Sequence, residues 1–142
     1  MSRFEKNALT DQERLQKELE IQKANLYGAY NHCRAVAVRE DYAEVALDIV
    51  PESLNFQGTV HGAAYYTMAD ICSGMVCRTD GRRYVTQQAN VQYLRAAEGG
   101  TLTARGTAIH RGRTSCLVEI RITNEEEQLM FMGTFLFHCI NT

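Results

Sequence analysis

A helix that is apolar on nearly every side constrains the fold of this chain more than any other feature. Residues 61–81 read HGAAYYTMADICSGMVCRTDG, and their apolar side chains cover most of the circumference of a helix. A helix with such coverage is buried rather than laid on a surface. We therefore expect the rest of the chain to wrap around this segment.

Alternating apolar and polar residues predict strands on both sides of that helix in the sequence. Residues 33–50 alternate around a polar turn at Glu40 and Asp41, which is typical of a hairpin. Four further alternating runs follow the helix, separated by turns suited to hairpins: about 83–96, 100–110, 114–124 and 128–140. An antiparallel sheet curled around one central helix hides such a helix, so the predicted class is α+β.

The N-terminal segment predicts one extra helix over about residues 10–29. Thr10 is a suitable N-cap with Glu13 three residues later, and Gly28 and Asn31 are expected to stop the helix. The apolar stripe of this helix is thin, so we expect it on the surface of the body or on a partner subunit.

Length and charge exclude several classes of protein. A chain of 142 residues fits one core, and we expect an N-terminal helical extension at 1–31 followed by a single domain at 32–142. The net charge of -2 and the pI near 6.1 argue against a nucleic-acid partner, which usually needs a clearly basic domain. No stretch approaches the length of a membrane span, and the charged start lacks the apolar segment of a secretory signal, so no membrane partner is expected.

The cysteines and histidines give no sign of a disulfide framework or a metal site. The five cysteines are odd in number and widely scattered, and none forms a C-x-x-C pair, which is typical of reduced thiols that pack as small hydrophobes. The four histidines are spread singly and match no zinc motif. We therefore expect a cytoplasmic protein without a metal.

Asp70 interrupts the apolar run of the central helix. Burying a carboxylate without partners costs several kcal/mol, so Asp70 needs either a structural hydrogen-bond network or a chemical task. For a lone helical aspartate the structural role is the ordinary expectation, and only the neighbouring residues favour the chemical one.

Gly62 is expected at the start of the same helix, where backbone N–H groups lack partners within the helix. The positive end of the helix dipole lies there too, so this N–H is suited to polarise a carbonyl or hold an oxyanion, although Gly58 and Gly62 also suit a plain tight loop. Gly62 and Asp70 are eight residues apart, about 12 Å along the helix axis. The two groups of one subunit therefore cannot both contact the same carbonyl. If both act on one substrate, the active site lies between two subunits.

Five residues spaced as N-x5-HG-A-x6-D carry a resemblance to a known family: Asn55, His61, Gly62, Ala63 and Asp70. The pattern resembles that of the phenylacetate-pathway (PaaI-like) thioesterases of the hotdog superfamily. The resemblance continues through VTQQANVQYLRAA at 85–97 and covers about 33–140, leaving the N-terminal helix unexplained. It implies a hotdog fold and hydrolysis of a coenzyme A thioester. Ala63 departs from the usual second glycine, which narrows the room beside the helix start and implies an altered substrate fit.

The resemblance also implies roles for single residues. Asp70 is the implied general base toward water or the nucleophile on the thioester carbon, and the sequence does not choose between them. The Gly62 N–H is implied to polarise the thioester carbonyl, while Asn55 helps to hold that carbonyl or the water. His61 shapes the helix start, and Thr86 orients the water from the neighbouring strand. For His61 and Thr86, an ordinary place in a loop and a strand is the alternative.

Coenzyme A is part of the implied substrate, so no separate cofactor is expected. The resemblance places three arginines where the nucleotide portion docks, as cations for its phosphates: Arg95, Arg111 and Arg113. Four apolar or aromatic side chains are expected to line the acyl pocket: Phe56, Tyr65, Tyr66 and Met68. These seven residues are also ordinary candidates for solvated turns and for the core. The mixture of aromatic groups and methionine permits aryl, short or medium acyl groups.

Three other functions stay open from the sequence. A hydroxyacyl dehydratase of the same fold usually has an apolar-proline signature after its histidine, and the chain lacks one after His61. A non-catalytic acyl-CoA sensor would use the same pocket, but it needs an output element, and one N-terminal helix is not a DNA-binding module. A pure assembly domain would keep the pattern only by coincidence. The implied partners are an acyl-CoA and further copies of this chain, as a homodimer or a homotetramer of two dimers.

Overall fold

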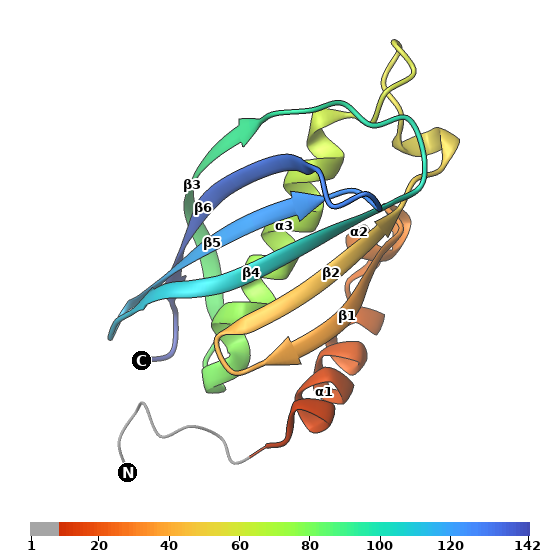
Figure 1. Cartoon of the computed structure of the whole chain (residues 1–142). Coiled ribbons are helices and arrows are strands. Elements are labelled where there is room, and N and C mark those ends of the chain that lie inside the picture. The colour runs from red at the N-terminus through yellow and green to blue at the C-terminus, as the bar shows by residue number, and fades with distance from the viewer. Residues whose placement is uncertain (1–8) are drawn as a thin grey trace.

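The computed structural model describes residues 9–142, which form one antiparallel sheet and a layer of helices. The strands are β1 (Cys33–Arg39), β2 (Tyr42–Asp48), β3 (Tyr84–Tyr93), β4 (Thr101–Arg111), β5 (Ser115–Thr123) and β6 (Leu129–Cys139). Their order is β1-β2-β4-β5-β6-β3, so β1 and β3 form the two edges (Figure 1). The predicted α+β class and the predicted strands are confirmed, although β3 ends at Tyr93 rather than near residue 96.

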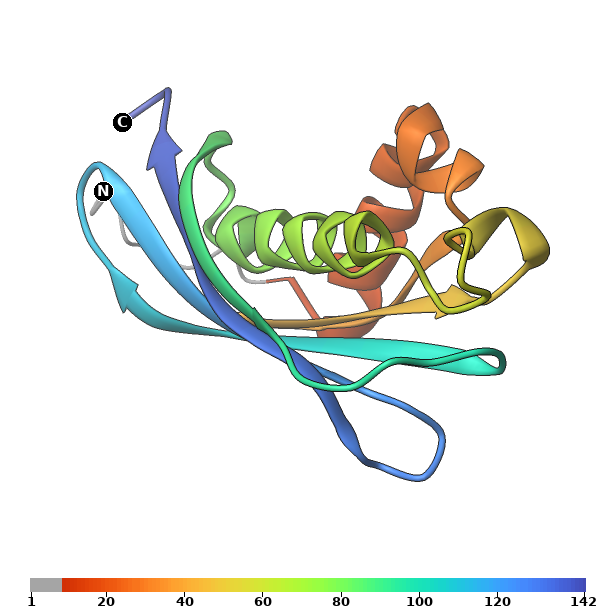
Figure 2. The same cartoon turned by 90° about the horizontal axis from the view of Figure 1, so that it is seen from above.

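The sheet curves around the central helix α3 (Gly62–Cys77), which lies in its concave face (Figure 2). Most side chains of α3 are buried against the inner faces of β2, β4 and β5. The largest fully buried side chains come from both layers, among them Leu47, Met68, Met75, Leu102, Ile120, Phe131 and Phe135. Each such side chain contributes about 1.5–3 kcal/mol by leaving water. The prediction that the sheet wraps this helix is therefore confirmed.

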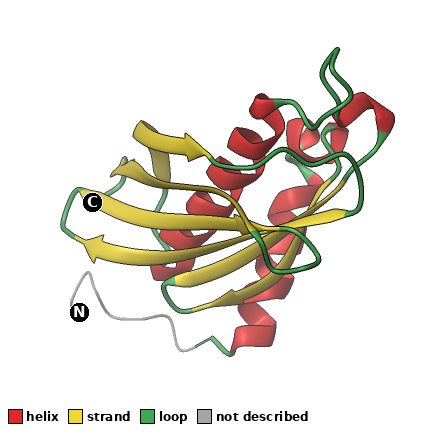
Figure 3. Cartoon of the chain, turned by 45° about the horizontal axis from the view of Figure 1, so that its top comes forward, coloured by secondary structure: helices red, strands yellow, loops and turns green. Residues whose placement is uncertain are grey.

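The predicted N-terminal helix is divided into α1 (Asp11–Lys23) and α2 (Leu26–Tyr30). Thr10 caps α1 as expected, because its hydroxyl accepts the Glu13 N–H and the Glu13 side chain accepts the Thr10 N–H. Helix α1 lies against β1, and α2 contacts both β1 and α3, so both lie on the helical side of the sheet (Figure 3).

The prediction that Gly28 stops the N-terminal helix is wrong. The break lies earlier, where Asn25 caps α2 by accepting the Gly28 N–H at 3.1 Å. Gly28 is buried inside α2, and a Cβ there would lie only 3.1 Å from Ile71 Cδ1 of α3. The missing side chain thus serves the close approach of α2 to α3, which periodicity cannot reveal.

Two short 3-10 helices lie before and after α3: η1 (Pro51–Ser53) and η2 (Arg78–Asp80). All five cysteines are free, and four of them are buried, which fits their role as small hydrophobes. The expected cytoplasmic location and the division at residue 31 stay predictions. No helix within residues 9–142 has both the length and the apolar character that crossing a membrane requires.

Candidate active site

Asp70 lies in the middle of α3 and faces β3. The Thr86 hydroxyl of β3 donates a hydrogen bond of 2.7 Å to Asp70 Oδ1. Burial raises the pKa of the Asp70 carboxyl above its ordinary value of 3.8, whereas the hydrogen bond from Thr86 and the positive charge of Arg78 oppose the rise. A carboxylate with a raised pKa is a stronger base than an exposed aspartate, which suits it to accept a proton from water.

A shallow pocket of about 250 Å³ opens beside Asp70. Thr86 and Gly74 line it together with three residues that the sequence did not single out: Gln22, Asn25 and Arg78. Arg78 follows Asp70 by eight residues on the same face of the helix, a spacing that could have drawn attention to it. No sequence signal connects Gln22 or Asn25 with this pocket, because folding alone brings the N-terminal segment here.

Gly62 is the first residue of α3, as expected, and His61 is its N-cap. His61 Nδ1 accepts the Ala63 N–H at 3.0 Å, so the proton of the neutral imidazole sits on Nε2. Among the described residues, no acceptor bonds to the Gly62 N–H. Ala63 has no positive φ, so its methyl group is accepted at this position without backbone strain. The helix start therefore offers the Gly62 N–H as an unpaired donor.

Asn55 organises the loop that leads into α3. Its Oδ1 accepts the N–H groups of Gln57 and Thr59 at 2.9 and 3.2 Å, and its Nδ2 donates to Thr59 Oγ1 at 3.1 Å. Phe56, at the tip of this loop, is 96% exposed. The Asn55 side chain therefore bonds within its own loop in a single subunit, and Phe56 lines no interior wall.

The aromatic residues of α3 divide between the core and the surface. Tyr65 is 3% exposed, stacks on Phe131 and donates its hydroxyl to the Arg95 carbonyl at 3.0 Å. Met68 is fully buried. Tyr66 is 37% exposed and lies close enough to Asp70 that the negative charge of the carboxylate contributes to its raised pKa. Of the side chains expected to line the acyl pocket from this helix, only Tyr66 reaches the surface beside Asp70, whereas Tyr65 and Met68 lie in the core.

The three arginines expected to meet coenzyme A do not come together in one subunit. Arg95 is exposed just after β3, near the start of α3, and Arg113 is exposed in the turn after β4, near the other end of that helix. The prediction that Arg111 is an exposed arginine of a turn is wrong, because its side chain is only 14% exposed. Among residues 9–142, no group of three or more His, Cys, Asp or Glu side chains is arranged to hold a metal ion.

Arg111 caps the C-terminal end of α3. Its guanidinium donates to the carbonyls of Val76 and Cys77 at 3.0 Å and pairs with Asp80 at 2.8 Å and with Asp41 at 2.9 Å. Helix ends leave carbonyls without partners and carry partial negative charge, so a cation there satisfies both needs. These contacts occupy the guanidinium within its own subunit and favour a structural role.

We expect the variant Arg111→Gln to lower the free energy of unfolding by about 2–3 kcal/mol, since it leaves buried carbonyls and the Asp80 carboxylate short of a partner. The loss stays below that of a fully broken ion pair because Arg82 still pairs with Asp80 at 2.9 Å. Urea denaturation measures the effect, and Arg113→Gln, two residues along and exposed, is the matched control. Equal midpoints for the two variants would contradict the capping role.

A curved antiparallel sheet around one central helix, with a carboxylate in the middle of that helix and an unpaired N–H at its start, defines a hotdog-fold thioesterase. Residues 57–131 match the family described as the thioesterase superfamily. This match spans more than half of the chain, and the chain belongs to that superfamily, among its PaaI-like members.

Two relatives, one of them compared both by sequence and by structure, illustrate the relationship. The acyl-coenzyme A thioesterase PaaI of Escherichia coli is 26% identical over 94 residues, which cover 66% of this chain and 67% of that protein. A hypothetical thioesterase of Streptococcus pneumoniae, solved with coenzyme A, is 30% identical with a TM-score of 0.77 and covers 83% of this chain and 95% of its own. The solved E. coli PaaI protein, 21% identical with a TM-score of 0.84, covers 90% of this chain and 94% of its own and supports the fold.

Proposed function

We propose that this protein hydrolyses an acyl-coenzyme A with an aryl or a short to medium acyl group, and that Asp70 is its general base or nucleophile. The observation that carries the proposal is the state of Asp70, a partly buried carboxylate with a raised pKa in an apolar helix. Thr86 alone among the described residues donates a hydrogen bond to this carboxylate, at Oδ1, so Oδ2 is left for water or substrate.

The donor that polarises the thioester carbonyl is the Gly62 N–H of a second subunit. Asp70 and Gly62 lie on one continuous helix about 12 Å apart, so a single subunit cannot apply both to one carbonyl. The long edge strand β3 supports an interface here, since it carries half-exposed apolar side chains at Val85 and Tyr93 and a row of backbone groups open to pairing. A homodimer or a dimer of dimers then forms the complete site, because a two-fold interface presents each Asp70 to the partner's helix start.

In the proposed reaction Asp70 takes a proton from water as the water attacks the carbonyl carbon. The carbonyl oxygen gains negative charge and is stabilised by the Gly62 N–H at the positive end of the helix dipole. The carbon–sulfur bond then breaks, and the thiolate of coenzyme A leaves and takes up a proton. In the nucleophilic variant Asp70 attacks the carbon directly, and water hydrolyses the resulting anhydride. Thr86 holds the carboxylate in place in both cases.

The remaining candidate residues have narrower proposed roles. Asn55 and His61 shape the loop and the helix start, and the exposed His61 Nε2 is free to donate to the substrate. Arg95 and Arg113 are proposed to meet the phosphates, from different subunits of the dimer, while Arg111 is occupied by its own subunit. Tyr66 and Phe56 are proposed to form the acyl wall.

A panel of acyl-CoA substrates tests this function. Aryl, short, medium and long acyl-CoA are mixed with the native protein, and the released thiol is measured. We expect turnover with at least one aryl, short or medium substrate, and a kcat/KM in the range of about 10⁴ M⁻¹s⁻¹ or above for the preferred one. Binding of acyl-CoA by calorimetry without any thiol release would instead identify a non-catalytic sensor.

A further inference from the structure

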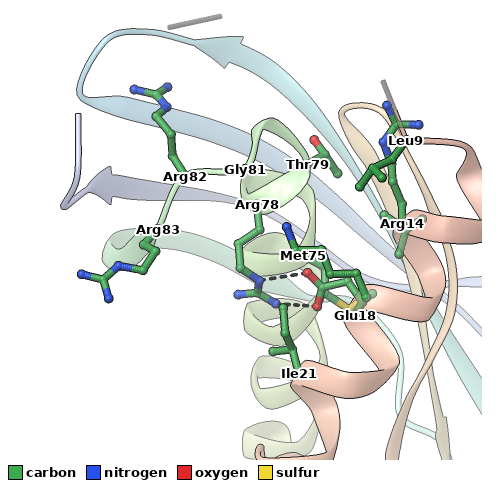
Figure 4. A pocket seen from close by; sticks show the side chains of 12 residues that line it. Leu9, Arg14, Glu18, Ile21, Met75, Arg78, Thr79, Gly81, Arg82 and Arg83 are labelled. Carbon is green, nitrogen blue, oxygen red and sulfur yellow. Dashed lines mark hydrogen bonds and ion pairs between the residues drawn. The ribbon is translucent and has the colours of Figure 1, made fainter. Parts of the chain in front are cut away.

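The ion pair between Glu18 and Arg78 joins α1 to the C-terminal end of α3. Glu18 is 5% exposed and is the only buried residue of this helix. It accepts hydrogen bonds from Arg78 Nε and Nη2 at 3.0 and 2.9 Å, across sixty positions of sequence. Figure 4 shows the two side chains pointing toward one another in the cleft between α1 and the C-terminal end of α3.

Stability alone does not explain this pair. A buried carboxylate and guanidinium lose their hydration, and apolar side chains of similar volume commonly dock a helix as well or better. Helix α1 nevertheless places a carboxylate where a leucine would serve. What the ion pair adds over an apolar contact is a fixed orientation of Arg78.

That orientation directs Arg78 toward Asp70. Asp70, Gly74 and Arg78 follow one another at intervals of four residues, so they lie on one face of α3. Gly74 has no side chain between the two charged groups, and a Cβ there would lie only 3.0 Å from Arg78 Nη1. Nη1 therefore lies back over the turn that begins at Asp70, and it is the nitrogen group that Glu18 does not use.

We propose that Glu18 of α1 is a positioning residue for the reaction, because it holds the Arg78 guanidinium across Gly74 with its Nη1 side in the Asp70 pocket. This inference rests on the proposed function and gives the N-terminal helix a part in it. Gln22 and Asn25, from the same N-terminal segment, line the same pocket. The segment is thus a wall of the active site.

Among the described residues that line the Asp70 pocket, Arg78 is the only cation. Tyr66 on α3 and Tyr84 on β3 both have a raised pKa, chiefly through burial, so they stay neutral at the working pH, and the Tyr84 hydroxyl is turned to Asp80. The other described residues that line the pocket from α1, β3 and β6 carry no charge. Arg78 thus favours the ionised form of Asp70, the form that acts as a base.

The test is the pH dependence of kcat/KM in matched variants. Arg78→Gln removes the cation, so the pKa of Asp70 should rise further and the acid limb of the profile should move to higher pH. We expect kcat/KM at the acid end to fall about three- to tenfold more than at the alkaline plateau. Arg78→Lys keeps a charge and should restore part of the shift. Glu18→Gln removes a negative charge, which by charge alone would move the limb to lower pH, whereas release of the guanidinium moves it to higher pH. Positioning therefore predicts a net shift in the same direction as Arg78→Gln.

Two comparisons separate positioning from general damage. Glu20→Gln removes an exposed carboxylate from the same helix, where it pairs with Lys23, and should leave the profile unchanged. The double variant Glu18→Gln/Arg78→Gln carries a neutral pair, and its profile should match that of Arg78→Gln alone if Glu18 acts only through Arg78. Should Glu18→Gln fail to fold, this double variant supplies the readout.

Wild-type acid limbs in Arg78→Gln and in the double variant would overturn the positioning role. A further shift of the double variant's limb to higher pH would also overturn it, since removal of the Glu18 charge alone moves the limb to lower pH and Glu18 would then act independently of Arg78. Asp70→Asn is measured in parallel. If that variant were active, the proposed reaction itself would fail, whereas an inactive Asp70→Asn beside unchanged limbs would reject only the role of Glu18.

Discussion

Replacing Asp70 with asparagine is expected to reduce kcat/KM for acyl-CoA hydrolysis by at least about 10³-fold, the loss typical of a removed catalytic base or nucleophile. Asparagine keeps the size of the side chain and still accepts the Thr86 hydrogen bond seen at 2.7 Å. It has no basic carboxylate, so it can neither take a proton from water nor attack the thioester carbon. Thiol release from the preferred acyl-CoA measures the loss.

The stability of Asp70→Asn distinguishes a catalytic role from a structural one. Burial raises the pKa of Asp70, so at neutral pH the ionised group destabilises the folded state relative to an ordinary carboxylate. A neutral amide removes this cost, and the melting temperature should equal or exceed that of the native protein. An active enzyme with a wild-type profile would refute the assignment of Asp70, and a large fall in melting temperature would point to a structural carboxylate.

Substituting Gly62 with proline is expected to lower kcat by about 10²–10³-fold, the usual effect of removing one donor to an oxyanion. Proline lacks the N–H in question and is well tolerated at the first position of a helix. The residue before it must be extended, and His61 already has φ -61° and ψ 137°. The variant therefore deletes the N–H while α3 keeps its start.

Gly62→Ala is the matched control for added volume. A Cβ at this position lies 3.4 Å from Tyr93 Cε1, which is ordinary contact, and the N–H is retained. We expect this variant to keep most of its kcat, with its main change in KM. Equal losses in the alanine and proline variants would mean that crowding, rather than the missing donor, is responsible.

Mixing the two inactive variants tests whether two subunits share one site. A dimer of one Asp70→Asn subunit and one Gly62→Pro subunit has one site with both groups intact, so random reassociation should restore about a quarter of the native activity. Coexpression and thiol release measure this recovery. No recovery in confirmed mixed dimers would place both groups within one subunit's site and overturn the shared arrangement.

The fold could be predicted in outline because the local periodicity of apolar residues indicates both of its layers. An apolar pattern all around residues 61–77 requires burial, and alternation in the later runs produces strands with one inner face. The division of the N-terminal helix could not be predicted. The break lies at the Asn25 cap, and the close approach of Gly28 to Ile71, which explains the buried glycine of α2, forms only after folding.

The candidate site could be predicted only in part. Asp70, Gly62 and His61 could be proposed from the sequence, because a carboxylate in an apolar helix and a histidine-glycine pair at the helix start are visible in the sequence itself. The interior place of Arg111 was missed, because a turn arginine looks the same whether it faces solvent or caps a helix. Glu18 was missed for a similar reason, since its partner lies sixty residues away.

The sequence by itself determined the buried helix, the strands that wrap it and the eight-residue spacing that separates the carboxylate from the helix start. These properties follow from hydrophobic period and helical rise, which depend only on neighbours along the chain. Tertiary structure decided the environment of that carboxylate, because Thr86, Arg78 and the walls of the pocket come from separate elements. Charge and burial act through space, so the basicity of Asp70 arises only when those elements meet.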